Sequence, residues 1–160
     1  MLAITTQELE KIRNECRFMV NNSALLSGGA AIIPVPGVDI ASDVGLLLEL
    51  LPKISRRFGL SPEQIEQLDS QTKMVIANLI IRLGTQLIGQ VLTKQLIMQI
   101  LKTVGIRMTM KQVVKYIPFA GQAAAAGLSF AAMQYVGNSH VDECYEVVKG
   151  VIKNKAFSVT

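Results

Sequence analysis

The sequence predicts an all-α fold class, a compact bundle of five to seven helices that forms one domain over residues 1–160. Apolar residues make up 50% of the chain and aromatic residues only 5%. The apolar content is therefore mainly Leu, Ile, Val, Ala and Met, among which Leu, Ala and Met are good helix formers. Apolar residues recur at helical spacing, and no segment of useful length alternates as a strand would. Glycine and proline mark the breaks between helical segments.

The first two helices are indicated by the residues at their ends. Thr5 and Glu8 have the spacing of a capping box, and helical periodicity then continues to about Gly28. A second helix is expected to begin near Pro36 or Asp39 and to run to Phe58. Gly59 follows it as the glycine that commonly closes a helix in the left-handed conformation.

The later helices are also predicted from their start signals. Residues 61–64, Ser-Pro-Glu-Gln, combine a cap residue, a first-turn proline and a Gln at the capping-box position. The helical pattern that follows has a break at Asp69. A further break is expected at Gly105, followed by a brief helix over residues 111–116. A long final helix is expected over about residues 119–153.

A short apolar turn of the type Ile-Pro-x-x-Gly occurs twice, once before the second helix and once before the last. Surface turns are usually polar, because a buried loop leaves backbone groups without partners. We expect these turns to be the packed bends of two helical hairpins within the bundle. Re-entrant hairpins inside a bilayer are the alternative. The turn residues are Pro34, Pro36, Gly37, Pro118 and Gly121.

Charge is distributed unevenly along the chain. The net charge is +4, yet residues 1–70 carry −3 and residues 71–160 carry +7. No acidic residue lies between Asp69 and Asp142. A region of one sign favours an anionic lipid surface or an acidic protein partner, and a solvated helix face is the alternative. The candidate contacts with an anionic surface are Lys94, Lys102, Arg107, Lys111 and Lys115.

No group of residues points to an enzyme, a metal site or a cofactor. Asp39 and Asp43 share a helix face, but no histidine or nucleophile accompanies them. His140 and Cys144 are four residues apart, and without a second ligand cluster they indicate a polar patch rather than a zinc site. Glycine-rich phosphate loops and aromatic residues interleaved with bases do not occur, so we expect no nucleotide or nucleic-acid partner.

The cysteines and the N-terminus suggest a location. Cys16 and Cys144 are far apart and fit a reducing compartment better than a disulfide framework. The first 20 residues read as an amphipathic helix rather than as a signal peptide. We therefore expect a cytoplasmic protein, with peripheral association at the inner face of the membrane as a further expectation.

Two segments carry a family resemblance. Residues 28–39, Gly-Gly-Ala-Ala-Ile-Ile-Pro-Val-Pro-Gly-Val-Asp, resemble the signature of the YcjF-type bacterial helical family of unknown function. Residues 114–121, Val-Lys-Tyr-Ile-Pro-Phe-Ala-Gly, look like that family's later Ile-Pro turn, and residues 57–60 also fit. Members are often fused to GTPase domains or encoded beside them. The resemblance spans about residues 20–150 and implies a helical module that works beside a GTPase or at a membrane.

The leading interpretation is a non-catalytic accessory module that binds a protein partner, such as a GTPase supplied by another chain, or a peripheral membrane through its hairpin tips. Its basic central region would face anionic lipid or an acidic partner. One alternative is a membrane-inserting or pore-forming effector whose small-residue hairpins enter the bilayer. Another is a soluble bundle that holds a lipid between its helices. The sequence leaves the oligomeric state open, a homo-oligomer included.

Overall fold

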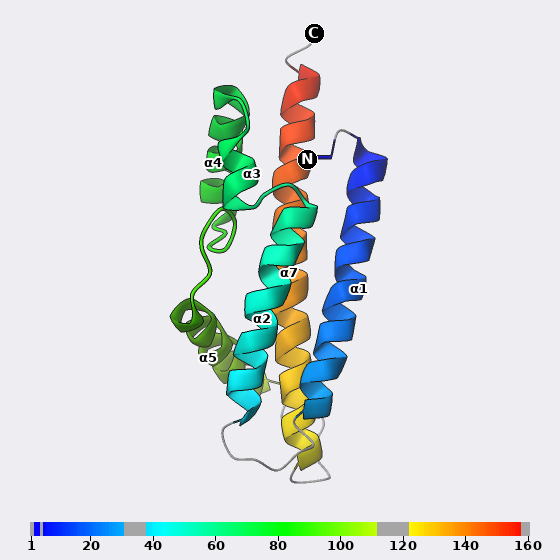
Figure 1. Ribbon diagram of the computed structural model, residues 1–160, viewed down its shortest axis with the longest axis vertical. Coiled ribbons are helices and arrows are strands. Elements are labelled where there is room, and N and C mark those ends of the chain that lie inside the picture. Colours follow the sequence, from blue (N-terminus) through cyan, green and yellow to red (C-terminus); the bar gives the residue numbers. More distant parts are fainter. Residues whose placement is uncertain (1, 4, 31–37, 112–121, 158–160) are drawn as a thin grey trace. The chain divides into compact units, whose positions relative to one another are not determined.

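The computed structural model describes residues 2–3, 5–30, 38–111 and 122–157, and every regular element in these residues is a helix (Figure 1). The all-α fold class predicted from the sequence is therefore confirmed. The helices are α1 (Thr6–Ala30), α2 (Val38–Arg57), α3 (Pro62–Glu66), α4 (Ser70–Leu83), α5 (Lys94–Lys111) and α7 (Gln122–Phe157).

The ends of the first two helices follow the predicted signals. The Oγ1 atom of Thr5 accepts a hydrogen bond from the Glu8 amide at 3.2 Å, so this hydroxyl caps α1. Just beyond α2, Gly59 has a φ of 75°, a left-handed conformation that glycine adopts without steric cost. Arg56 and Arg57 lie in the last turn of α2, where they complement the negative end of the helix dipole.

Capping also determines where α3 and α4 begin. Ser61 Oγ accepts a hydrogen bond from the Gln64 amide, and the Gln64 side chain accepts one from the Ser61 amide. The predicted capping box is thereby confirmed. The break predicted at Asp69 is confirmed as well, because the Asp69 carboxylate caps α4. At the other end of α4, Gly84 has a φ of 67°.

The structure corrects one predicted boundary and refines another. The break predicted at Gly105 is wrong, because α5 is helical without interruption from Lys94 to Lys111. A glycine inside a helix costs only about 1 kcal/mol relative to alanine, and no proline follows it there. The brief helix predicted over residues 111–116 falls mainly outside the described residues. The final helix extends to Phe157, beyond its predicted end.

The chain divides into two compact units, each made of stretches that are distant in the sequence. Unit 1 comprises Met1–Arg17, Leu51–Val91 and Ser139–Thr160, and unit 2 comprises Phe18–Leu50 and Leu92–Asn138. The single domain expected over residues 1–160 stays a prediction.

In unit 1, α4 lies beside the C-terminal part of α7, which is drawn in red in Figure 1. Leu79 of α4 approaches Gly150 of α7 so closely that a Cβ atom at position 150 would meet Leu79 Cδ1 at 2.7 Å. The absence of a side chain at Gly150 therefore permits this contact between α4 and α7. The buried core of the unit includes Leu9, Ile54, Phe58, Leu60, Ile76, Val147 and Val148.

In unit 2, a second glycine of α7 permits a close approach. A Cβ atom at Gly137 would meet Val20 Cγ1 of α1 at 2.7 Å, and Val20 Cβ at 3.3 Å. Beside this contact, Gln134 Nε2 donates a hydrogen bond to Asn21 Oδ1 at 2.5 Å. The buried core of the unit includes Val20, Ala24, Val44, Leu47, Ile97, Met133 and Val136.

The two apolar turns predicted at Pro34, Pro36 and Gly37 and at Pro118 and Gly121 lie outside the described residues, so they stay a prediction. In the described parts of the chain, none of the helices combines the length and the apolarity that crossing a bilayer requires.

Candidate functional site

Helix α5 presents the first of the candidate surfaces. Thr93 precedes it, and its Oγ1 atom accepts a hydrogen bond from the Leu96 amide at 3.2 Å, which caps the helix. Ile97 and Val104, seven residues apart, are buried on one side of the helix. The exposed side chains of α5 lie to one side of these two residues, beginning about 60° from Ile97.

The exposed side of α5 carries Lys94, Met98 and Lys102, which are four residues apart and share one face. Both lysines are exposed, and Met98 is 39% exposed. No acidic residue occurs in α5, and neither lysine forms an ion pair within the described residues. We call these three residues the α5 face.

The other three bases of the predicted contact set cannot be added to the α5 face. Arg107 and Lys111 belong to α5, but their side chains lie outside the described part of the chain. Lys115 lies outside it altogether. The structure thus brings together two of the five predicted bases, and adds Met98 between them.

A buried polar cluster lies in unit 1, where α2 and α7 meet at His140. Ser55 Oγ of α2 and His140 Nε2 of α7 share a hydrogen bond at 2.8 Å. Cys144 Sγ, one turn further along α7, lies 3.7 Å from the same nitrogen. His140 is 1% exposed and Cys144 is fully buried, as is Cys16 of α1.

The chemistry of this cluster is that of a protein interior. Burial lowers the pKa of His140 to about 4, and the backbone of Leu51 opposes this shift only in part. Burial raises the pKa of the Cys16 thiol to about 12 and raises the pKa of Cys144 well above its ordinary value. At neutral pH the imidazole is therefore uncharged and both thiols are protonated. A protonated buried thiol is a poor nucleophile and a poor metal ligand.

The polar group predicted at His140 and Cys144 is thus buried in the structure. They lie in the middle of α7, where an i, i+4 pair shares one face, and this face packs inward in unit 1. The hydrogen bond between Ser55 and His140 could not be predicted from the sequence, because the two residues are 85 positions apart and no local spacing connects them.

Charged side chains also connect α1 to α7 within unit 1. Asp142 Oδ1 accepts hydrogen bonds from Nη2 of both Arg13 and Arg17, each at 2.9 Å. The hydrogen bond with Asp142 is the main reason why the pKa of Arg13 is raised. The Arg13 guanidinium also lies 4.4 Å from the centroid of the Tyr145 ring, and the Tyr145 hydroxyl donates to Glu10. These cations serve the contact between two helices.

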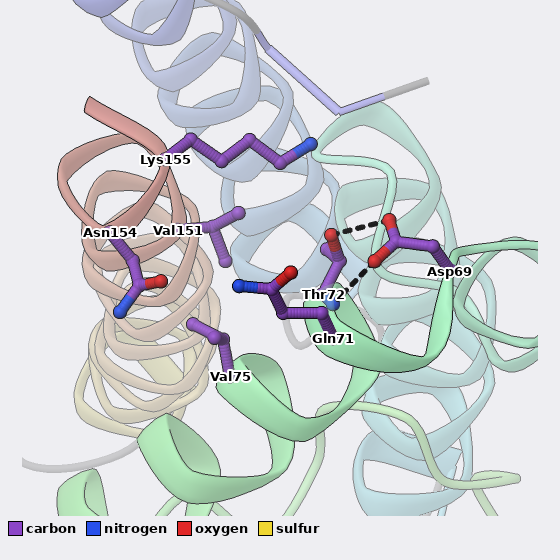
Figure 2. Close-up of a pocket in the computed structure, with 7 residues that line it drawn as sticks. All are labelled: Asp69, Gln71, Thr72, Val75, Val151, Asn154 and Lys155. Carbon is purple, nitrogen blue, oxygen red and sulfur yellow. Dashed lines mark hydrogen bonds between the residues drawn. The ribbon is translucent and has the colours of Figure 1, made fainter. Parts of the chain in front are cut away.

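A hollow of about 220 Å³ lies in unit 1 between the first turns of α4 and the last turns of α7 (Figure 2). Figure 2 shows Val75 of α4 and Val151 of α7 among polar side chains from both helices. The lining residues are Asp69, Gln71, Thr72, Val75, Val151, Asn154 and Lys155.

The carboxylate at this hollow is engaged by the helix start. Asp69 Oδ1 accepts from the Thr72 amide at 2.9 Å, and Asp69 Oδ2 accepts from the Thr72 hydroxyl at 2.6 Å. These hydrogen bonds lower the pKa of Asp69, and the bond from the Thr72 hydroxyl contributes most. The seven lining residues contain no histidine or cysteine, their one carboxylate caps α4, and their one hydroxyl donates to that carboxylate. The hollow therefore offers no acid–base pair and no activated nucleophile.

Comparisons with known proteins place no further constraint on these sites. No protein-family model matches the chain, and no curated protein or solved structure matches it. Within the described residues, no three His, Cys, Asp or Glu side chains are grouped as ligands for a metal ion. The α5 face is the candidate site that best combines exposure with one sign of charge.

Proposed function

We propose that this protein is a non-catalytic helical interaction module that binds an anionic membrane surface through the α5 face. The observation that carries the proposal is the exposure of Lys94 and Lys102 on one face of a helix without acidic residues. This helix belongs to the stretch between Asp69 and Asp142, which contains no acid at all. A surface of one sign attracts its opposite, whereas mixed charges largely cancel.

The expected strength of this attraction is modest. Each Lys or Arg near an anionic leaflet contributes about 1 kcal/mol, and the attraction fades within about one Debye length. Two lysines alone therefore support reversible binding. Met98, exposed between them, adds apolar contact at the level of the headgroups.

The resemblance to the YcjF-type family extends the proposal to a partner. In that view the helices form one bundle with bends at the two Ile-Pro turns, and the module acts beside a GTPase at the inner face of the cytoplasmic membrane. The GTPase would be supplied by another chain. A GTPase encoded beside this protein would support that extension.

Flotation with lipid vesicles tests the membrane proposal. The protein is expected to float with mixed phosphatidylcholine and phosphatidylglycerol vesicles at low salt, and to remain behind with phosphatidylcholine alone. Binding should weaken as salt rises toward about 1 M, where the Debye length shrinks to about 3 Å. The double variant Lys94→Gln/Lys102→Gln should bind at least tenfold more weakly, because it removes two of the cationic contacts, each worth about 1 kcal/mol.

A matched control removes the same charge elsewhere. Lys11 and Lys153 are exposed and belong to unit 1, so Lys11→Gln/Lys153→Gln lowers the net charge equally while leaving the α5 face intact. Equal loss of binding by both double variants would attribute the binding to net charge and contradict the proposed face. Leakage of a trapped dye from the vesicles would instead indicate the pore-forming alternative.

A further inference from the structure

Helix α4 exposes a second surface, of a different kind. Met74 is 64% exposed and Ile81 is 79% exposed, and Ala77 between them is exposed as well. At about 100° per residue these three side chains fall on one face of the helix. We call them the α4 stripe.

The remainder of α4 explains why the stripe faces outward. Thr72 and Ile76 are buried on the other side of the helix. Leu79, also on that side, is the residue that approaches Gly150 of α7. Packing within unit 1 thus uses one side of α4 and leaves the apolar stripe on the opposite side.

Two bases flank the α4 stripe. At about 100° per residue, Lys73 lies about 100° to one side of Met74, and Arg82 lies about 80° to the other side. Arg82 is exposed and Lys73 is half-buried. Asn78, which is also exposed, lies about 40° from Met74 on the side of Arg82. An apolar stripe with a cation at one edge and a polar residue and a cation at the other is typical of a helix that lies in a membrane interface. There, Lys and Arg stems follow the apolar surface and their charged ends reach the headgroups.

The charges on α4 also decide between possible occupants. The helix contains no acidic residue, so pairing of this face with the same face of a second copy would place cations only beside cations. An anionic lipid surface supplies both the apolar layer for the stripe and the negative charge for its two edges. The complementarity therefore favours lipid.

We propose that the α4 stripe enters the headgroup region of an anionic membrane, with Lys73 and Arg82 at the level of the phosphates. This inference rests on the proposed membrane function and adds a shallow apolar insertion to the electrostatic contact of α5. Binding through α5 is sensitive to salt, whereas insertion of the stripe resists salt because the apolar contribution is not screened.

The chain has no tryptophan, so one introduced at the stripe reports on that site alone. In Met74→Trp, the emission should shift to shorter wavelength when mixed phosphatidylcholine and phosphatidylglycerol vesicles are added. Asn14→Trp, at an exposed polar position of α1 in the same unit, is the matched control and should not shift. A shift of equal size at both positions, or at neither, overturns the inference.

Substitution of the stripe gives an independent measurement. Ile81→Ser should reduce the binding that persists at high salt by about tenfold, since it removes a large exposed apolar side chain. Leu25→Ser in α1 removes a side chain that is exposed to the same 64% as Met74, and should leave binding unchanged. Equal loss in both variants overturns the inference.

The two proposals fail in distinguishable ways. If the parent protein floats with salt-sensitive binding but the emission of the Met74→Trp variant does not shift, the proposed function stands and the α4 inference is wrong. If the parent does not float and the emission of that variant does not shift, both are wrong. If the emission shifts while the lysine variant of α5 binds normally, the membrane contact is at α4 and the α5 face is not its site.

Discussion

Helices α7 and α5 use their side chains in opposite ways. From His140 onward, α7 engages its neighbours in unit 1 through a buried hydrogen bond, a shared carboxylate and a close contact at Gly150. On α5 of unit 2, Ile97 and Val104 are buried, while Lys94 and Lys102 are exposed and outside any ion pair among the described residues. Polar groups of α7 thus support the fold, and those of α5 remain available to a partner.

Because of this difference, effects on folding and effects on binding can be separated in this protein. A substitution on the inward side of α7 removes contacts that the folded state needs, so its effect should appear in the free energy of unfolding. A substitution of Lys94 or Lys102 on α5 removes no ion pair among the described residues, so its effect should appear in binding alone.

Acidification should destabilise the fold through His140. A histidine with a lowered folded-state pKa stabilises the fold above its unfolded pKa and loses this contribution as pH falls. The window runs from about pH 6.5 in the unfolded chain to about pH 4 in the folded one. By linkage the loss approaches roughly 3 kcal/mol at the acid end. Urea unfolding across this window measures it.

The control for this prediction is His140→Gln, which keeps a hydrogen-bonding side chain and cannot titrate. Carboxylates with lowered pKa, such as Asp69 and Glu63, contribute to acid sensitivity in both proteins. The histidine contribution is therefore the difference between the two stability profiles. Parallel profiles between pH 6.5 and pH 4 would show that His140 does not carry the effect.

At Gly137, the close contact between α7 and α1 should make alanine unfavourable. A Cβ atom would lie 2.7 Å from Val20 Cγ1 and 3.3 Å from its Cβ, and the β-branched valine has little freedom to move away. Overpacking costs about 1–3 kcal/mol, against a gain of about 1 kcal/mol in helix propensity. Gly137→Ala should therefore lose about 1 kcal/mol in chemical denaturation.

Gly45 of α2 is the matched control, because it belongs to the same unit and a Cβ atom there would meet nothing within 4 Å. Gly45→Ala should gain about 0.5–1 kcal/mol from helix propensity alone. If both alanine variants were equally stabilised, the contact between Gly137 and Val20 would not be as close as the structure shows.

Loss of the Asp142 carboxylate, which Arg13 and Arg17 share, should have the smallest effect on stability among these substitutions and the pH change. Asp142→Asn leaves Arg13 and Arg17 without their anionic partner, and the groups involved are only partly buried. Half-exposed ion pairs contribute about 1 kcal/mol or less. Thermal unfolding should therefore show a drop of a few degrees. The Lys94→Gln/Lys102→Gln variant should have the melting temperature of the parent protein. A similar drop in its melting temperature would contradict the proposed difference between α7 and α5.

Much of the fold could be predicted because its signals are local. Thr5, Ser61 and Asp69 cap the helices they precede, and Gly59 adopts the left-handed conformation at the end of α2. Each of these interactions spans only a few residues, so the sequence pattern contains it. The break expected at Gly105 fails because a single glycine weakens a helix without ending it.

The parts that could not be predicted depend on distant partners. Helical spacing places His140 and Cys144 on one face, but only the packing of α7 in unit 1 determines that this face is buried. Arg13 and Asp142 are 129 residues apart, so no spacing pairs them. The α4 stripe could not be predicted either. It lies in the almost continuously apolar segment over residues 74–101, where periodicity does not distinguish the buried side of a helix from the exposed side.

The buried thiols of Cys16 and Cys144 can report on the opening of unit 1. Cys16 and Cys144 are both inaccessible and protonated in the folded state, so an alkylating reagent in solution can react only after the unit opens. Since both cysteines of the chain belong to unit 1, the alkylation rate follows the opening of that unit without any label being introduced. Pulse labelling on vesicles could thus ask whether a membrane loosens unit 1 or leaves it closed.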